Sequence, residues 1–258
     1  MDRPLFDYLL RLADSDLVLA QRLGEWVGKG PVLEEDIALT NVGLDLIGQA
    51  RFWYAYAGEV EARYAGEFRS EDELAFLRDG ASYRNLLLVE QPNGNYADTM
   101  ARQFYFDQWH LRLLHALSAS RDARIAEIAA KAVKEVAYHA ERSIDWVLRL
   151  GDGTDLSHGR MQAALDELWP FVGEMFAIDA VERQLIDAGV AADLGALQDS
   201  WHAAVANVCA EATLTMPAGE WMQGAGERGG KQGVHSEHLG RMLAEMQFLQ
   251  RAYPGATW

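Results

Sequence analysis

Apolar residues recur every three or four positions through most of the chain, which is the spacing of residues on one face of an α-helix. No stretch shows the alternation typical of a strand, and there is no repeat of fixed period. Proline is scarce, with 6 in 258 residues, so few positions interrupt a helix. The pattern therefore predicts an all-α protein. Its helices are expected at about 4–28, 34–58, 72–77, 96–118, 123–151, 157–176, 181–188, 193–214 and 236–253.

Turn residues mark several of the boundaries between these helices. The run from Gly28 to Pro31 ends the first helix, and the connection to the second is so short that the two should be antiparallel neighbours. The run from Pro92 to Asn95 predicts a turn, and Asn95 is suited to cap the helix that follows. One face of the second helix is expected to hold Ile37, Asn41, Leu44, Gly48, Phe52 and Ala55.

A histidine, His139, stands on the apolar stripe of the helix expected at 123–151. A histidine that faces the core must find a hydrogen-bond partner or lose its charge. In helical bundles that bind two irons, such a histidine follows a glutamate by three positions, so that both side chains reach one metal. Here that position is Val136, and Glu135 is displaced by about 100° around the helix. The pattern resembles a metal half-site that has lost its carboxylate.

Polar residues interrupt the apolar faces of all four long helices. Gly48 follows Asp45 by three positions, where a second histidine would stand in a di-iron bundle. We interpret the polar positions as remnants of a degenerate site, in a buried hydrogen-bonded network, rather than as a working metal centre. No catalytic, cofactor-binding or metal-binding residue is expected in this chain. The remnants are Asp16, Asp45, Asp107, His110 and His139, and His139 is expected to bond to Asp45 or Asp107.

The charge of the chain limits its partners. Its formal net charge is −16 and its sequence pI about 4.8, which disfavours nucleic acid and suits docking to a basic protein. Residues 1–10 lack the pattern of a signal peptide, and no apolar run approaches the roughly 20 residues that span a bilayer. A cytoplasmic protein without membrane contact is expected.

Three further motifs have simple interpretations. His235 and His238 have the spacing of a metal clamp, but they lack further obvious ligands, so a solvated helix start is expected. The run from Gly224 to Gly229 matches GxGxxG by letters, yet it follows a helix, so dinucleotide binding is rejected. The single cysteine, Cys209, has no basic neighbour in sequence and is expected to be buried and inert.

Several stretches resemble the C subunits of bacterial ring-epoxidising phenylacetyl-CoA monooxygenases, also called 1,2-phenylacetyl-CoA epoxidases. They lie in family order along almost the whole chain, and the longest is quite specific. They read LVLAQRLGEWVG, NVGLDLIGQAR, NLLLVEQPNGNYADTMARQ, KAVKEVAYH and HSEHLGRMLAEMQFLQR.

The resemblance implies one ferritin-like domain over residues 1–258, with a core bundle at about 4–151 and additional packing helices at about 157–253. It also implies a structural, non-catalytic subunit whose partner, a related A subunit, holds the di-iron centre. In such systems a reductase with flavin and an iron–sulfur cluster supplies electrons, and one atom of O₂ enters the ring of phenylacetyl-CoA. The depleted metal site is indicated independently, by the residues alone.

Two alternatives stay open at this point. The chain is alternatively a ferritin-like oxidase with an unusual ligand set such as Asp45, Asp107 and His139, or a helical scaffold unrelated to oxygenation. As a structural subunit, the chain would act through its surface, with the A subunit or with a second copy as partner. Aromatic residues in the second and third long helices exceed what one inward stripe holds, so some are expected at that interface, with Trp53 and Tyr105 outward. The set is Trp53, Tyr54, Tyr56, Tyr105 and Trp109.

Overall fold

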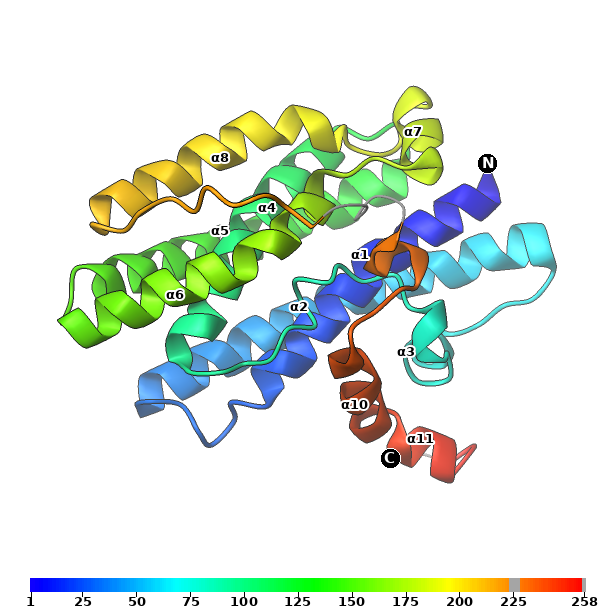
Figure 1. Cartoon of the computed structure of the whole chain (residues 1–258). Coiled ribbons are helices and arrows are strands. Elements are labelled where there is room, and N and C mark those ends of the chain that lie inside the picture. Colours follow the sequence, from blue (N-terminus) through cyan, green and yellow to red (C-terminus); the bar gives the residue numbers. More distant parts are fainter. Residues whose placement is uncertain (223–227, 257–258) are drawn as a thin grey trace. The chain divides into compact units, whose positions relative to one another are not determined.

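The computed structural model describes residues 1–222 and 228–256, and these residues form helices and loops without any strand. Figure 1 shows the order of the helices along the chain. The all-α prediction is confirmed. The helices are α1 (Asp2–Gly24), α2 (Leu33–Ala65), α3 (Glu71–Phe76), η1 (Gly80–Ser82), α4 (Tyr96–Leu117), α5 (Ala123–Gly151), α6 (Asp155–Val172), η2 (Gly173–Phe176), α7 (Ala180–Asp187), α8 (Leu194–Glu211), η3 (Gly230–Gln232), α10 (Glu237–Met246) and α11 (Phe248–Ala252).

Local capping explains where several helices begin. The Asn95 side chain accepts from the Ala97 amide, and Asp98 closes the capping box at the start of α4. Asp122 accepts from two backbone amides at the start of α5. The C-terminal end of α2 lies seven residues beyond the predicted residue 58. The helix stops at Gly66, which adopts the left-handed conformation. The helix expected at 236–253 is divided at Gln247 into α10 and α11.

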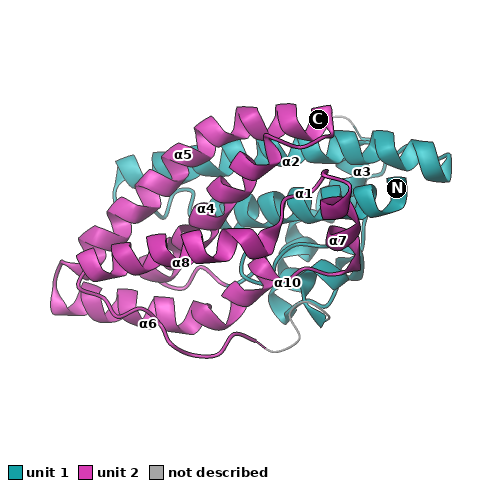
Figure 2. Cartoon of the chain, turned by 90° about the horizontal axis from the view of Figure 1, so that it is seen from above, with its two compact units in different colours: residues 1–91, 227–258 teal, residues 92–226 magenta. Residues whose placement is uncertain are grey.

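The chain divides into two compact units, which Figure 2 colours separately. Unit 1 comprises residues 1–91 and 227–258, and unit 2 comprises residues 92–226. Unit 1 is built on α1 and α2, which run antiparallel side by side as predicted (Figure 1). In unit 2, α4 packs on α5, α6 and α8. One ferritin-like domain over residues 1–258, with its core bundle at 4–151, stays a prediction.

The inner face of α2 differs from the predicted one. Trp53, Tyr54 and Tyr56 are buried, although part of the aromatic set was expected to point outward. Leu44, expected on the same inward face as Ile37, is 59% exposed. The prediction was wrong because α2 is apolar on more than one side, and a step of one residue turns the helix by about 100°. The buried apolar residues of α2 are Leu39, Val42, Leu46, Ala50, Trp53, Tyr54, Tyr56, Ala57 and Val60.

The aromatic residues of α4 are also buried, so the expected outward position of Tyr105 was wrong. The Tyr105 hydroxyl donates to the Leu165 carbonyl at 3.2 Å, and the Trp109 indole donates to the Met175 carbonyl at 3.0 Å. The Trp201 indole of α8 in turn donates to the Tyr105 carbonyl at 3.1 Å. The helices that follow α5 therefore pack against the aromatic side chains of α4 inside unit 2. Their carbonyl groups also supply polar partners, which buried indole and phenol groups need.

Candidate functional site

The remnant positions of unit 2 form a buried polar cluster between α4 and α5. Asp107, His110 and His139 are each at most 2% exposed, which confirms the expected burial of His139. The Gln103 amide donates to Asp107 at 3.4 Å, and Ser143 lies within hydrogen-bonding reach of the same carboxyl group. The hydrogen bonds that favour the charged form of Asp107 thus come from α4 and α5. A bond from His139 to Asp107 or Asp45 stays a prediction.

Burial suppresses charge in this cluster. It raises the pKa of Asp107 to about 7, while hydrogen bonds from Ser143 and Gln103 and the charge of Arg142 act in the opposite direction. Burial, and to a smaller extent the charge of the neighbouring His139, lower the pKa of His110 to about 3. A metal ligand must give up its proton, and a set of bound irons needs several negative carboxylates. Burial thus keeps His110 neutral and favours the protonated form of Asp107 below about pH 7, which is compatible with a hydrogen-bonded core.

The two remnant positions of unit 1, Asp16 and Asp45, differ in burial. Asp16 of α1 is 1% exposed, and burial raises its pKa well above the ordinary value, opposed by a hydrogen bond from Trp53. Asp45 of α2 is only half-buried, as is Gly48. Within the described part of the chain, no group of three or more His, Cys, Asp or Glu side chains is placed to hold a metal ion. The expectation that this chain binds no metal stays a prediction.

The shifted pKa of Asp107 predicts a pH effect on stability. Between its ordinary 3.8 and about 7, the folded chain holds a proton that the unfolded chain releases, so Asp107 makes the free energy of unfolding fall as pH rises. His110 acts in the opposite direction between about 3 and 6.5. Asp107→Asn should therefore gain stability over the wild type from pH 4 to pH 7, by up to a few kcal/mol.

Thermal midpoints of the two proteins at pH 5 and pH 8 measure this effect. Asp145→Asn, at an exposed position of α5, is the control and should shift both midpoints little. If Asp107→Asn changed the thermal midpoint by the same amount at both pH values, the raised pKa of Asp107 would be contradicted.

Sequence reasoning missed a second buried charge, Asp14 of α1, which is fully buried. Arg78 forms an ion pair with it, the Tyr54 hydroxyl donates to it, and the Arg84 amide donates to it at 2.7 Å. Burial lowers the pKa of Arg78, but Asp14, Tyr54 and Tyr83 together outweigh this effect and leave the pKa raised. Arg78 lies 64 positions along the chain from Asp14, so no local spacing revealed the pair.

Another buried carboxylate, Glu90, contacts the beginning of α10. Its oxygens accept from the Asn85 amide at 3.0 Å and the Ser236 backbone amide at 2.6 Å, and one lies 3.0 Å from the Nδ1 atom of His235. The Nε2 atom of His235 is 3.1 Å from the Tyr83 carbonyl oxygen. The expectation of a solvated His235 was wrong, because the residue precedes the helix and contacts an interior carboxylate that the sequence did not single out.

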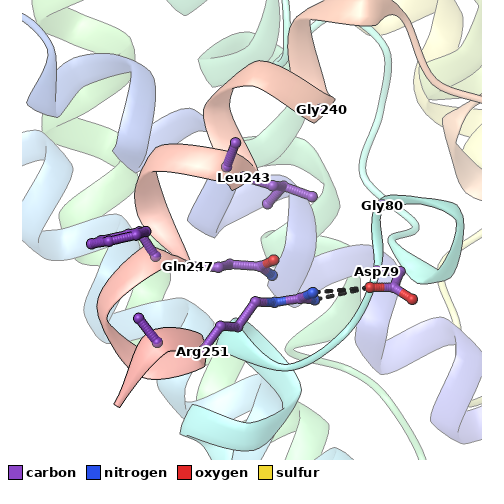
Figure 3. Close-up of a pocket in the computed structure, with 9 residues that line it drawn as sticks. Asp79, Gly80, Gly240, Leu243, Gln247 and Arg251 are labelled. Atoms are coloured by element: carbon purple, nitrogen blue, oxygen red, sulfur yellow. Dashed lines mark hydrogen bonds and ion pairs between the residues drawn. The ribbon is translucent and has the colours of Figure 1, made fainter. Parts of the chain in front are cut away.

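An open groove lies along the C-terminal helices of unit 1, shown in Figure 3. One hollow of about 510 Å³ is lined by α10, α11 and the residues around Asp79 and Gly80. In Figure 3 the Arg251 side chain extends across the hollow to Asp79, with Gln247 and Leu243 on the same side. A second hollow of about 530 Å³ shares Arg251 and is lined by α3 and residues 253–256.

The remaining motifs add no chemistry. Cys209 is buried, and burial raises its thiol pKa to about 11, in agreement with an inert thiol. The run from Gly224 to Gly229 falls largely outside the described residues. Among those that are described, no helix combines the length and the apolar character needed to cross a membrane.

Comparison with known proteins agrees with the sequence resemblance. Over residues 1–258 the chain matches the family described as phenylacetic acid catabolic protein. The chain belongs to this family. A relative from Escherichia coli (strain K12), the C subunit of 1,2-phenylacetyl-CoA epoxidase, is 52% identical over 251 residues, which cover 97% of this chain and 98% of that protein. The family is ferritin-like and helical, which confirms the predicted fold class.

The Asp14–Arg78 pair predicts a large effect on stability. Arg78→Met should lower the free energy of unfolding by about 3–5 kcal/mol, because it leaves a buried carboxylate without its cation. Arg3→Met is the matched control on α1, since the Arg3–Asp7 pair is largely exposed and should contribute less than about 1 kcal/mol. Urea unfolding of the three proteins measures the difference, and equal midpoints would refute the importance of the buried pair.

Proposed function

We propose that this chain is the structural, non-catalytic C subunit of a cytoplasmic multicomponent oxygenase that epoxidises the ring of phenylacetyl-CoA in phenylacetate degradation. The observation that carries the proposal is the 52% identity to the C subunit of such an epoxidase along nearly the full length of both proteins. A related catalytic A subunit is the proposed partner, and it holds the di-iron centre.

The buried cluster of unit 2 supports a structural role. At the positions where a di-iron bundle carries carboxylates and imidazoles, this chain has Val136 and a carboxyl group with raised pKa, Asp107. Such groups contribute to the core through packing and hydrogen bonds. A ferritin-like oxidase that uses Asp45, Asp107 and His139 would need all three deprotonated and gathered on one metal. Among the described residues, no group of three or more His, Cys, Asp or Glu side chains is placed to hold one.

The outward face of α2 supports a partner of similar helical shape. Five large apolar side chains follow one side of the helix and are between 39% and 71% exposed. From Leu33 to Phe52 this stripe is about 28 Å long, at a rise of about 1.5 Å per residue. Several large apolar side chains exposed along one side of a helix are typical of interaction sites, and the cores of subunit interfaces are apolar. The outer α2 face consists of Leu33, Ile37, Leu44, Ile47 and Phe52.

We therefore assign the outer α2 face to the A subunit. The related helices of the A subunit are suited to pack on it, as helix faces do in bundles. When the chain is alone, the same face is available to a second copy, which gives the expected homodimer. The predicted use of α2 for the interface is kept, but the residues move from Trp53 to the opposite side of the helix.

Charge placed on this face should prevent assembly. The double variant Ile37→Glu/Leu44→Glu should reduce co-purification with the A subunit by about tenfold or more, because it buries carboxylates in an apolar interface. Circular dichroism should be unchanged, since both side chains are exposed in the chain alone. Leu156→Glu on α6, where Leu156 is 63% exposed, is the control and should assemble normally.

If the α2 variant assembles as well as the wild type, the outer α2 face is not the interface. If the wild-type chain fails to bind an A subunit under any co-expression condition, the structural-subunit proposal itself is wrong and the scaffold alternative is favoured.

Iron content separates the proposal from the oxidase alternative. The purified chain, loaded with ferrous iron and desalted, should retain no stoichiometric metal by elemental analysis. Gly48→His/Val136→Glu restores the missing members of both half-sites, and we expect weak metal binding at best with a loss of stability from buried charge. About two irons per wild-type chain would contradict the proposal.

A further inference from the structure

Hydrogen bonds from α11 and from Gln247 to the backbone at the end of α3 fix the C-terminal helices beside the groove. Helix α3 ends at Phe76, and its last carbonyl groups lack partners within the helix. The Gln247 amide donates to the Ala75 carbonyl at 3.1 Å and to the Arg78 carbonyl at 3.0 Å. The Arg251 guanidinium donates to the Phe76 carbonyl at 3.2 Å and to the Arg78 carbonyl at 2.8 Å. The C-terminal helices therefore cap α3 and form a built surface.

The walls of the groove are apolar and exposed. Leu77 is 52% exposed, and Phe248 and Tyr253 are each 59% exposed. All three line one or the other of the two hollows, and both hollows are bounded by Arg251. Single exposed apolar residues are normal on a protein, whereas large ones gathered around a hollow mark a contact site.

The rim of the groove is acidic. Asp79 pairs with Arg251 at 3.1 Å, which neutralises the guanidinium. Asp72 and Glu73 then add two carboxylates to the lining of the second hollow. An occupant that complements this surface carries positive charge beside an apolar side chain. A second copy of this chain complements this acidic rim poorly, because its acidic residues outnumber its basic ones by 39 to 23.

We propose that this groove binds a cationic amphipathic segment of another protein, with an apolar or aromatic side chain in the hollow and a Lys or Arg facing Asp72. The site is separate in sequence from the outer α2 face and does not depend on the assignment of the A subunit. It gives this chain a second protein contact, which recognises positive charge beside an apolar side chain. Two such contacts suit a subunit whose role is to join components.

The test uses a labelled twelve-residue peptide of alternating leucine and lysine pairs, measured by fluorescence anisotropy against the full chain. A matched peptide with glutamate in place of lysine should not bind. Asp72→Lys and Phe248→Ala should each weaken binding of the cationic peptide by about fivefold or more. Glu245→Lys makes the same charge change at an exposed α10 position outside the lining and is the control.

A benzophenone placed in the peptide locates the contact by mass spectrometry after crosslinking. We expect crosslinks to residues 72–79 and 248–256. Equal weakening by Asp72→Lys and Glu245→Lys would show diffuse attraction to an acidic protein and overturn the proposal. No binding, binding of the glutamate peptide, or concentration-dependent self-association that Phe248→Ala removes would overturn it as well.

Discussion

The buried Asp14 carboxylate is the interaction on which unit 1 depends. A fully buried charge is tolerated only when it is paired and hydrogen-bonded, and Asp14 draws its donors from three places in the chain. Arg78 connects it to the segment after α3, and Tyr54 connects it to α2. The irregular stretch between α3 and α4 is thereby fixed on the α1–α2 pair, although it has little helix of its own.

The C-terminal helices are attached to this same stretch. Gln247 meets the Tyr83 hydroxyl and the backbone near Arg78, while Glu90 receives the start of α10. Residues from both ends of the chain thus meet around one irregular segment, and the groove beside Arg251 lies where the C-terminal helices pack on it. Unit 2 buries its acidic and imidazole groups in a different way. There the buried titratable groups Asp107 and His110 favour their uncharged forms, which reduces the cost of burying them.

The sequence predicted the helices well because their signals are local. Asn95 caps α4 as expected, α5 begins at the expected residue 123, and the α5 stripe that contains His139 is buried. The inner face of α2 was not predictable in the same way, since Leu44 and Trp53 are both apolar and periodicity does not say which side another element covers. The Asp14–Arg78 and Glu90–His235 contacts join residues 64 and 145 positions apart, a distance at which spacing carries no signal. The groove depends on those contacts, so it could not be predicted from the sequence either.

We propose that this chain contributes structure and surface to an oxygenase while the metal belongs to its partner. Anomalous X-ray diffraction at the iron absorption edge, on crystals of the chain assembled with its A subunit, tests that claim directly. We predict iron peaks in the partner chain and none between α4 and α5 of this chain. An iron peak beside Asp107 and His139 would contradict the account.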